Sequence, residues 1–380
     1  MKSITILGCT GSIGTQTLDV IAAYPCDYKV CGLVCRGNID LLDKQIAAFS
    51  PSFVCVADEQ KADIIRAKHK GLDVLSGYDG VIEAAGIKCD IVVNALVGID
   101  GLLPTINAIK SGCNIALANK ETLVTGGESV MALAKEYGVS ILPVDSEHSA
   151  VWQCLEGRGE CDKIILTASG GAFRDYTLDM LKSATAAQAL KHPTWDMGKK
   201  VTIDCATMMN KGFEVIEAMR LFDKSPDDIE VLIHRQSIVH SMVKYSDGSI
   251  IAQLSYPDMK LPIQYALGYP VRGKREFSPL DLCAAPLTFE RPDLERFPCL
   301  AIAYDCARAG GIYPAILNAA DEILVDYFCR GLIKFYDISY YINKSIDYVG
   351  AKSLGNGIDA VLEADKITRS YLIDCPDKRW

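Results

Sequence analysis

Two carboxylates stand one residue apart directly after an apolar, strand-like segment. The segment covers residues 139–144, and the tetrapeptide DSEH follows at 145–148. Open α/β sheets bind ligands at the carboxyl ends of their strands, and carboxylate oxygens are the ligands that Mg2+ and Mn2+ prefer. Asp145 and Glu147 therefore indicate a divalent metal site. The capping of a helix at 149–155 explains the same residues equally well.

A second set of polar residues lies at helical spacing. Asn210, Lys211 and Glu214 follow a strand expected at 201–205. Residues three and four apart share one face of a helix, so this face can bind a phosphate through Asn210 and Lys211 and a metal through Glu214. The alternative is a Lys–Glu pair on the surface, and on this spacing alone it is the better explanation.

A Ser-Gly-Gly turn at 169–171 follows another expected strand, at 163–167. Successive backbone N–H groups in such a turn can form a nest that binds an anion. An ordinary turn without a ligand is the alternative.

The segment HPTWDMG at 192–198 places Trp195 and Met197 between a proline and a glycine. This arrangement is typical of a mobile lid with an apolar tip that closes over a substrate. A surface loop with Trp195 packed inward is the alternative.

The chain also carries a glycine turn, GCTGSIG at 8–14, between a strand expected at 3–8 and a helix expected at 15–23. Strand, glycine turn and helix in this order predict a site for a dinucleotide pyrophosphate. The next strand, 29–35, ends at Arg36 where NAD enzymes place an acidic residue, so the sequence favours the 2′-phosphate of NADP. A glycine-rich turn without a ligand is the alternative.

Strand and helix patterns alternate from the first residue to about 145. Further strands are expected at 52–57, 90–94, 114–118 and 139–144, and helices at 58–70, 104–111 and 128–137. This alternation predicts an α/β fold with an N-terminal Rossmann-like, doubly wound parallel sheet over residues 1–145. The loops 95–98 and 119–121 are expected to line its cofactor crevice.

The rest of the chain changes character twice. Residues 146–268 read as a central α+β catalytic or connective domain with a mixed or antiparallel sheet, its strands at 163–167, 201–205, 229–234, 238–245 and 250–256, the last two joined by a hairpin. Residues 269–298 hold several prolines and are expected to be a linker. Helical patterns at 301–309, 315–329, 338–349 and 357–371 predict a C-terminal helical bundle over 299–380.

Composition limits the partners. The net charge of −9 argues against nucleic acid as the main partner. No apolar run reaches the roughly 20 residues that span a bilayer, and the first strand begins almost at Met1, so we expect a cytoplasmic protein. The 15 cysteines form no CxxC pair, which favours buried thiols over zinc ligands or disulfides.

Together, the motifs resemble the 1-deoxy-D-xylulose 5-phosphate reductoisomerase family. The matching strings, in the family's order, are GCTGSIG (8–14), LANKETLVT (117–125), ILPVDSEH (141–148), SGGAFR (169–174), HPTWDMGKK (192–200), ATMMNKGFE (206–214), VLIHRQSIVHSMVKYSDGS (231–249) and LNAADEI (317–323). The resemblance implies isomerisation of a keto-sugar phosphate, followed by reduction with NADPH to 2-C-methyl-D-erythritol 4-phosphate. It also implies a Mg2+ or Mn2+ cofactor and a homodimer.

The resemblance also assigns residues. The metal ligands would be Asp145, Glu147 and Glu214, with Lys120 and His192 also in the catalytic set. The substrate would be bound by Lys120, Ser146, Glu147, Ser169, His192, Trp195, Cys205, Asn210, Lys211 and Glu214, of which Ser169, Cys205, Asn210 and Lys211 correspond to the phosphate site. NADPH would contact Thr10, Gly11, Ser12, Ile13, Arg36, Gly37, Asn38, Asn119, Glu121 and Gly198.

Two positions depart from the family pattern: Cys205 replaces the usual serine, and Arg235 stands where proline is common. A thiol is a weaker donor than a hydroxyl, so we expect weaker phosphate binding or a rearranged contact, while Arg235 either adds charge near the site or lies on the surface.

Two other classes of protein are alternatives to this family. One is an NADP-dependent semialdehyde dehydrogenase, which requires a cysteine nucleophile with a histidine base, and the other is a non-catalytic NADP sensor.

Overall fold

The computed structural model describes residues 1–157, 161–191, 197–273 and 278–374, which form two compact units. Unit 1 comprises Met1–Thr122, Val130–Ser149 and Asp258–Ser278; unit 2 comprises Leu123–Ser129, Ala150–Pro257 and Pro279–Trp380. Among the described helices, none is both long enough and apolar enough to cross a bilayer.

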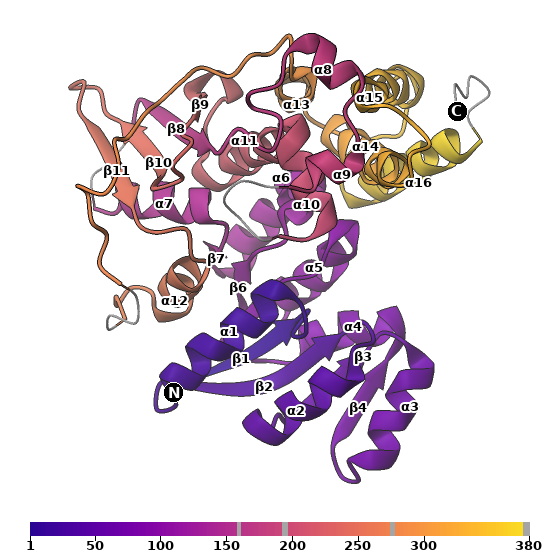
Figure 1. The fold of residues 1–380 in the computed structure, drawn as a ribbon. Coiled ribbons are helices and arrows are strands. Elements are labelled where there is room, and N and C mark those ends of the chain that lie inside the picture. The colour runs from indigo at the N-terminus through magenta and orange to yellow at the C-terminus, as the bar shows by residue number, and fades with distance from the viewer. Residues whose placement is uncertain (158–160, 192–196, 274–277, 375–380) are drawn as a thin grey trace. The chain divides into compact units, whose positions relative to one another are not determined.

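Unit 1 is built on a seven-stranded sheet in the order β4-β3-β2-β1-β5-β6-β7, with every neighbouring pair parallel (Figure 1). The strands are β1 (Lys2–Leu7), β2 (Tyr28–Cys35), β3 (Phe53–Val56), β4 (Asp73–Ser76), β5 (Ile91–Asn94), β6 (Asn114–Leu117) and β7 (Ile141–Pro143). Strands such as β3 and β5 are buried along their whole length, as in parallel sheets covered on both faces. The expected doubly wound sheet is confirmed.

The helices of unit 1 follow from this strand order. They are α1 (Ser12–Ala23), α2 (Ile39–Phe49), α3 (Glu59–Lys68), α4 (Gly77–Gly86), α5 (Leu102–Lys110), α12 (Lys260–Gly268) and the ends of α6 (Lys120–Tyr137). The chain runs outward from β1 to β4 and returns to β5 on the other side of β1. Because parallel crossovers are right-handed, the helices before and after this reversal cover opposite faces. Among these elements and the strands, α2, β4, α4 and α12 were not expected from the sequence.

Unit 2 contains a mixed four-stranded sheet in the order β11-β10-β8-β9. β8 (Lys163–Ala168) is parallel to β9 (Ile229–Ile233) and antiparallel to β10 (Val239–Lys244), which forms the expected hairpin with β11 (Ile250–Leu254). The expectation of a mixed or antiparallel sheet is therefore confirmed.

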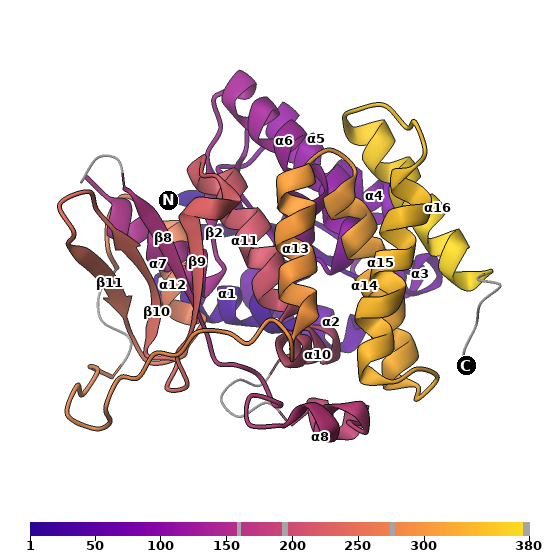
Figure 2. The same ribbon diagram turned by 90° about the horizontal axis from the view of Figure 1, so that it is seen from above.

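Helices form the remainder of unit 2. They are most of α7 (Ser146–Leu155), α8 (Leu178–Lys182), α9 (Ala186–Ala189), α10 (Lys199–Thr207), α11 (Met209–Phe222), α13 (Pro298–Ala309), α14 (Tyr313–Cys329), α15 (Phe335–Gly350) and α16 (Ile358–Ile373). Figure 2 shows α11 beside α13, and α14 beside α15 and α16. One core, which includes Phe173, Phe213 and Leu317, joins these helices to the sheet.

The strand expected at 201–205 is wrong, because this segment belongs to α10. Its β-branched residues favour a strand by propensity. However, Ile203, Ala206 and Thr207 are buried at spacings of three and four, and α10 packs against α11 and α14. Packing of this helical face against two neighbours outweighs the local propensity.

Candidate active site

The glycine turn in unit 1 is packed so closely that two of its glycines have no room for a side chain. Gly8 has φ +86°, and a Cβ there would stand 2.5 Å from the carbonyl oxygen of Ala95. A Cβ at Gly14 would stand 2.2 Å from the carbonyl oxygen of Gly8. α1 therefore begins directly against the turn, with Gly11 as its N-cap and no capping side chain. This geometry fits a pyrophosphate at the helix N-terminus.

Arg36 lies just past the carboxyl end of β2, and its side chain is exposed. The backbone around it is fixed, because Lys61 Nζ donates to the carbonyl of Gly37 at 3.0 Å and Asn38 caps α2 by accepting from the N–H of Leu41. A fixed backbone with an exposed guanidinium fits a bound 2′-phosphate. Lys61 was not identified from the sequence, since nothing in its own motif signals this contact.

Two asparagines hold the loop after β5. Asn119 Nδ2 donates to the carbonyls of Leu96 and Gly98 at 3.1 and 3.0 Å, and to Glu121 Oε2 at 2.9 Å. Asn94, at the end of β5, accepts from the N–H of Leu96. Asn94 was missed, although an asparagine that ends a buried apolar strand is a signal that could have been used.

The acidic pair after β7 has two structural functions at once. Asp145 accepts a hydrogen bond from the N–H of Glu147 at 3.3 Å at the start of α7, and it also forms an ion pair with Lys120. Ser146 Oγ donates to Glu147 Oε2 at 2.5 Å. Unit 1 thus brings Lys120, Asp145, Ser146 and Glu147 together at the carboxyl edge of the sheet. The helix-capping explanation and a ligand site are compatible here.

His148 belongs to the same cluster, although sequence reasoning gave it no function. It is fully buried, and its Nδ1 lies 3.7 Å from Asp145 Oδ1. Its place in DSEH, one helical turn after Asp145, was the available signal.

Glu214 lies in a buried polar cluster on α11. Asn210 Nδ2 donates to Glu214 Oε1 at 2.6 Å, and Lys211 forms an ion pair with the other carboxylate oxygen. Lys211 is 3% exposed and Glu214 is 1% exposed, so the explanation as a surface pair is wrong. Buried charges require compensating partners, and two hydrogen-bonded charges held here are typical of a functional site rather than of a solvated helix face.

The Ser-Gly-Gly turn lies against the end of α10. Gly170 and Gly171 have φ of +83° and +68°, and the N–H of Gly171 donates to Ser169 Oγ at 3.2 Å. A Cβ at Gly171 would stand 2.3 Å from the carbonyl oxygen of Cys205. Unit 2 thus brings the turn next to Cys205.

Met208, with φ +66°, joins α10 to α11. Asn210 and Lys211 therefore follow Cys205 after one sharp turn and lie in the first turn of α11, where the helix dipole favours anions.

The lid residues His192 and Trp195 lie outside the described residues. Gly198, which follows them, is the N-cap of α10, and its carbonyl accepts from the N–H and the hydroxyl of Thr202 at 3.0 and 2.9 Å.

Arg235 forms surface ion pairs. Its guanidinium contacts Asp175 Oδ1 at 2.7 Å and Glu290 Oε1 at 3.0 Å, both on exposed carboxylates. Two other histidines also have polar partners: His69 Nε2 lies 2.7 Å from Asp43 Oδ1, and the buried His234 has its Nδ1 2.9 Å from the carbonyl oxygen of Thr288. The described cysteines are free thiols, also as expected.

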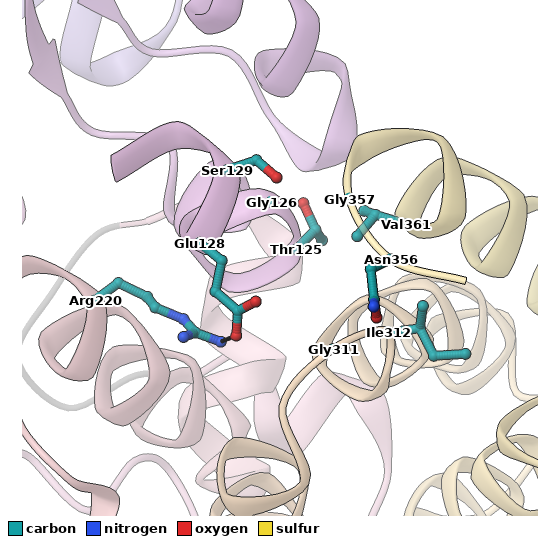
Figure 3. Close-up of a pocket in the computed structure, with 10 residues that line it drawn as sticks. All are labelled: Thr125, Gly126, Glu128, Ser129, Arg220, Gly311, Ile312, Asn356, Gly357 and Val361. Carbon is teal, nitrogen blue, oxygen red and sulfur yellow. Dashed lines mark ion pairs between the residues drawn. The ribbon is translucent and has the colours of Figure 1, made fainter. Parts of the chain in front are cut away.

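A separate pocket in unit 2 involves none of the expected site residues (Figure 3). It lies between α6, α11 and the starts of α14 and α16. Figure 3 shows Arg220 pointing to Glu128, with which it forms an ion pair at 2.8 Å.

The fold and these sites define a dinucleotide-binding α/β protein with two further polar clusters. Three family models match the chain. The model of 1-deoxy-D-xylulose 5-phosphate reductoisomerase matches residues 4–127, and the model of the 1-deoxy-D-xylulose 5-phosphate reductoisomerase C-terminal domain matches residues 141–222. The model of the DXP reductoisomerase C-terminal domain matches residues 254–371. The chain is 50% identical over 377 residues to 1-deoxy-D-xylulose 5-phosphate reductoisomerase 1 of Bacillus anthracis, covering 98% of this chain and 97% of that protein. The enzyme of Caldanaerobacter subterraneus subsp. tengcongensis is 51% identical over 379 residues, covering 98% and 99%.

Solved structures of reductoisomerases superpose on this chain over nearly its whole length. A crystal structure of DOX-P reductoisomerase in complex with NADPH, fosmidomycin and magnesium superposes with a TM-score of 0.93 at 40% identity, covering 98% of each chain. The Zymomonas mobilis enzyme in complex with NADPH gives a TM-score of 0.91 at 37% identity, covering 98% of this chain and 99% of that one. The chain belongs to the 1-deoxy-D-xylulose 5-phosphate reductoisomerase family.

Proposed function

We propose that this protein is an oxidoreductase that converts 1-deoxy-D-xylulose 5-phosphate into 2-C-methyl-D-erythritol 4-phosphate with NADPH and a divalent metal ion. The observation that carries the proposal is the match to this family over 98% of the chain at about half identity. The product places the enzyme in isoprenoid precursor synthesis by the methylerythritol phosphate route.

Most of the cofactor roles fall on unit 1. Thr10, Gly11, Ser12 and Ile13 belong to the turn that would bind the pyrophosphate, and Gly8 and Gly14 allow this turn to pack closely against Ala95 and the start of α1. Arg36 would bind the 2′-phosphate from the end of β2, helped by Gly37 and Asn38. Asn119 and Glu121, whose side chains are hydrogen-bonded to each other, and Gly198 of unit 2 complete the proposed NADPH contacts.

The metal ligands we propose are Asp145, Glu147 and Glu214. Their carboxylate oxygens are the hard donors that Mg2+ and Mn2+ prefer. A bound ion at these ligands supplies Lewis-acid stabilisation for negative charge on the substrate's keto and hydroxyl oxygens.

The chain's own groups position the substrate. Lys120, which contacts Asp145, and Ser146, which contacts Glu147, would hold its oxygens beside the ligands. Ser169, Cys205, Asn210 and Lys211 would bind the phosphate, supported by the nest geometry and the first turn of α11. His192 and Trp195 are proposed as lid residues that exclude water.

Two finer assignments complete the proposal: the protein is a homodimer, and it acts in the cytoplasm. The first comes from the family resemblance alone, and the second from the sequence, in which no apolar run reaches the length that spans a bilayer. Sedimentation of the purified protein, compared with the mass of one chain, tests the first assignment.

The test of function is NADPH oxidation, followed by absorbance, with 1-deoxy-D-xylulose 5-phosphate and either Mg2+ or Mn2+. We expect turnover that requires the sugar phosphate and stops when a chelator is added. Turnover that survives chelation would favour a semialdehyde dehydrogenase, in which Cys205 would be the nucleophile. Tight NADPH binding without turnover would favour a sensor.

A further inference from the structure

A lysine ammonium in unit 2 is held between two buried carboxylates on different helices. Lys200 Nζ on α10 donates to Asp204 Oδ2 at 2.6 Å, one turn along the same helix, and to Asp321 Oδ2 on α14 at 2.8 Å. The same nitrogen lies 5.0 Å above the centre of the Phe213 ring on α11. One side chain thus ties together three helices.

This cluster has one negative charge too many for its surroundings. The side chains of Asp204 and Asp321 are 3% and 0% exposed, and their Oδ1 atoms are buried and receive no hydrogen bond from the described residues. One ammonium neutralises only one of two ionised carboxylates, and an uncompensated buried charge is strongly unfavourable. A proton held between the two carboxylates removes the excess charge, as in other close carboxylate pairs.

Within the part of the chain that the structure describes, no second cation is hydrogen-bonded to either carboxylate. Burial raises the pKa of the Cys299 thiol on α13 and of the Cys329 thiol on α14, so both stay neutral near pH 7. The charge of Lys199 lowers the pKa of the Cys329 thiol, against the larger effect of burial. Helix α9, which packs against α10 and α14, carries only alanine and glutamine and so adds no charge. Burial first, and then the Asp321 carboxylate, raise the pKa of Asp204, in agreement with a retained proton.

The cluster lies next to the residues proposed to bind phosphate. Asp204 directly precedes Cys205, whose carbonyl packs against Gly171. The carbonyl of Asp204 accepts from Thr207 Oγ1 at 3.2 Å, and that hydroxyl accepts from the N–H of Met209 at the start of α11. A shift of α10 at Asp204 therefore moves Cys205 and the first turn of α11 together.

We propose that Lys200, Asp204 and Asp321 are positioning residues that fix α10 on α14 and thereby set the geometry of the substrate phosphate site, with one proton shared by the two carboxylates. The part of the proposal that concerns the phosphate site rests on the proposed function. The part that concerns the shared proton does not. At alkaline pH the proton is lost, the carboxylates repel each other, and phosphate binding weakens.

The test uses the full-length protein and three variants. Lys200→Met should raise the KM for 1-deoxy-D-xylulose 5-phosphate about 10- to 100-fold, since small misplacements of binding groups have effects of this size, and should leave the KM for NADPH within about twofold. Lys224→Met is the matched control, because it removes a lysine whose Nζ donates to the carbonyl of Cys161 in the same unit. It should leave both KM values unchanged.

Asp321→Asn provides the readout that a purely structural contact would not give. It keeps the shape and removes one charge, so the KM for the sugar phosphate should stay within about threefold of wild type at pH 7 and its alkaline rise should disappear. If Lys200→Met does not fold, the pH dependence of the KM in Asp321→Asn still tests the proposal. An unchanged alkaline rise in Asp321→Asn, or an equal rise of both KM values in folded Lys200→Met, would overturn the proposal.

Infrared spectroscopy with 13C-labelled aspartate separates this proposal from the proposed function. Wild-type protein should show a protonated carboxyl band at pH 7 that is lost in both Asp204→Asn and Asp321→Asn. A band that persists in both variants, or is absent from wild type, contradicts the shared proton whether or not the protein turns over the sugar phosphate. Failure of turnover with the band present would refute only the function and the phosphate-site part.

Discussion

The α-carbon of Gly171 lies so close to Cys205 that an added Cβ would be 2.3 Å from the carbonyl oxygen of Cys205. This contact joins the Ser-Gly-Gly turn to the end of α10, and no side chain can be accommodated in it without a backbone shift. The two segments proposed to bind the phosphate are thus fixed to each other by one glycine.

Gly171→Ala should therefore weaken phosphate binding. The new methyl group clashes with backbone, and φ of +68° is strained for alanine. We expect the KM for the sugar phosphate to rise about tenfold or more, measured by steady-state NADPH oxidation. Gly157→Ala is the control, because it has φ of +69° but open space around the new Cβ. Equal effects of the two substitutions would show that strain, not the contact, is responsible.

Cys205→Ser should lower the KM for the sugar phosphate or leave it unchanged. A hydroxyl is a stronger hydrogen-bond donor than a thiol, and Cys205 is partly exposed, so the smaller serine leaves no large cavity. Cys329→Ser, at another partly exposed cysteine of unit 2, controls for general effects of losing a thiol. A large loss of activity confined to Cys205→Ser would contradict this view of the phosphate site and support a nucleophilic cysteine.

Sequence patterns predicted the parts of this fold that repeat along the chain. The alternation of β1, α1 and β2 around the glycine turn identified the dinucleotide-binding unit, because each element carries its own hydrophobic pattern. The spacing of Asn210, Lys211 and Glu214 correctly predicted a shared helix face. It could not predict their burial, which depends on how other elements pack over α11.

The Lys200 cluster shows why the rest was not predictable. Lys200 and Asp204 are four residues apart. In an extended strand this separation would be about 13 Å, whereas in α10 it is about one helical turn, and the two side chains are in contact. The expectation of a strand at 201–205 therefore concealed this pair. Asp321 comes from a helix more than 100 residues away, and no local pattern connects it to Lys200.

Arg36→Asp should shift the coenzyme preference from NADPH toward NADH. An aspartate at the end of β2 can accept a hydrogen bond from the ribose 2′-hydroxyl and repels a 2′-phosphate. The ratio of kcat/KM for NADPH to that for NADH should fall by at least about tenfold. Lys29→Asp reverses a charge near the other end of β2 and should leave this ratio unchanged. No shift in Arg36→Asp would count against the 2′-phosphate site.

Glu214→Gln should reduce kcat by orders of magnitude, because an amide oxygen is a poorer metal ligand than a carboxylate. NADPH affinity, measured by fluorescence titration, should be unaffected, since the proposed pyrophosphate turn lies in unit 1. Glu230→Gln, on β9, is a matched control that should retain normal kcat. Near-normal turnover of Glu214→Gln at saturating Mg2+ would refute the metal role.

Asp204→Asn should flatten the pH dependence of stability. Burial raises the pKa of Asp204 in the folded protein, so above pH 4 the folded state retains a proton that the unfolded chain releases. The free energy of unfolding therefore falls as pH rises, by at most about 1.4 kcal/mol per pH unit, until the raised pKa is reached. Asparagine cannot take part in this equilibrium, so the wild-type decline above about pH 4 should be smaller in the variant, as measured by urea denaturation. The exposed Asp247, whose pKa is lowered by hydrogen bonds from Ser249, gives the control Asp247→Asn, which should not flatten the curve. Parallel curves for wild type and Asp204→Asn would mean that Asp204 is ionised in the folded protein.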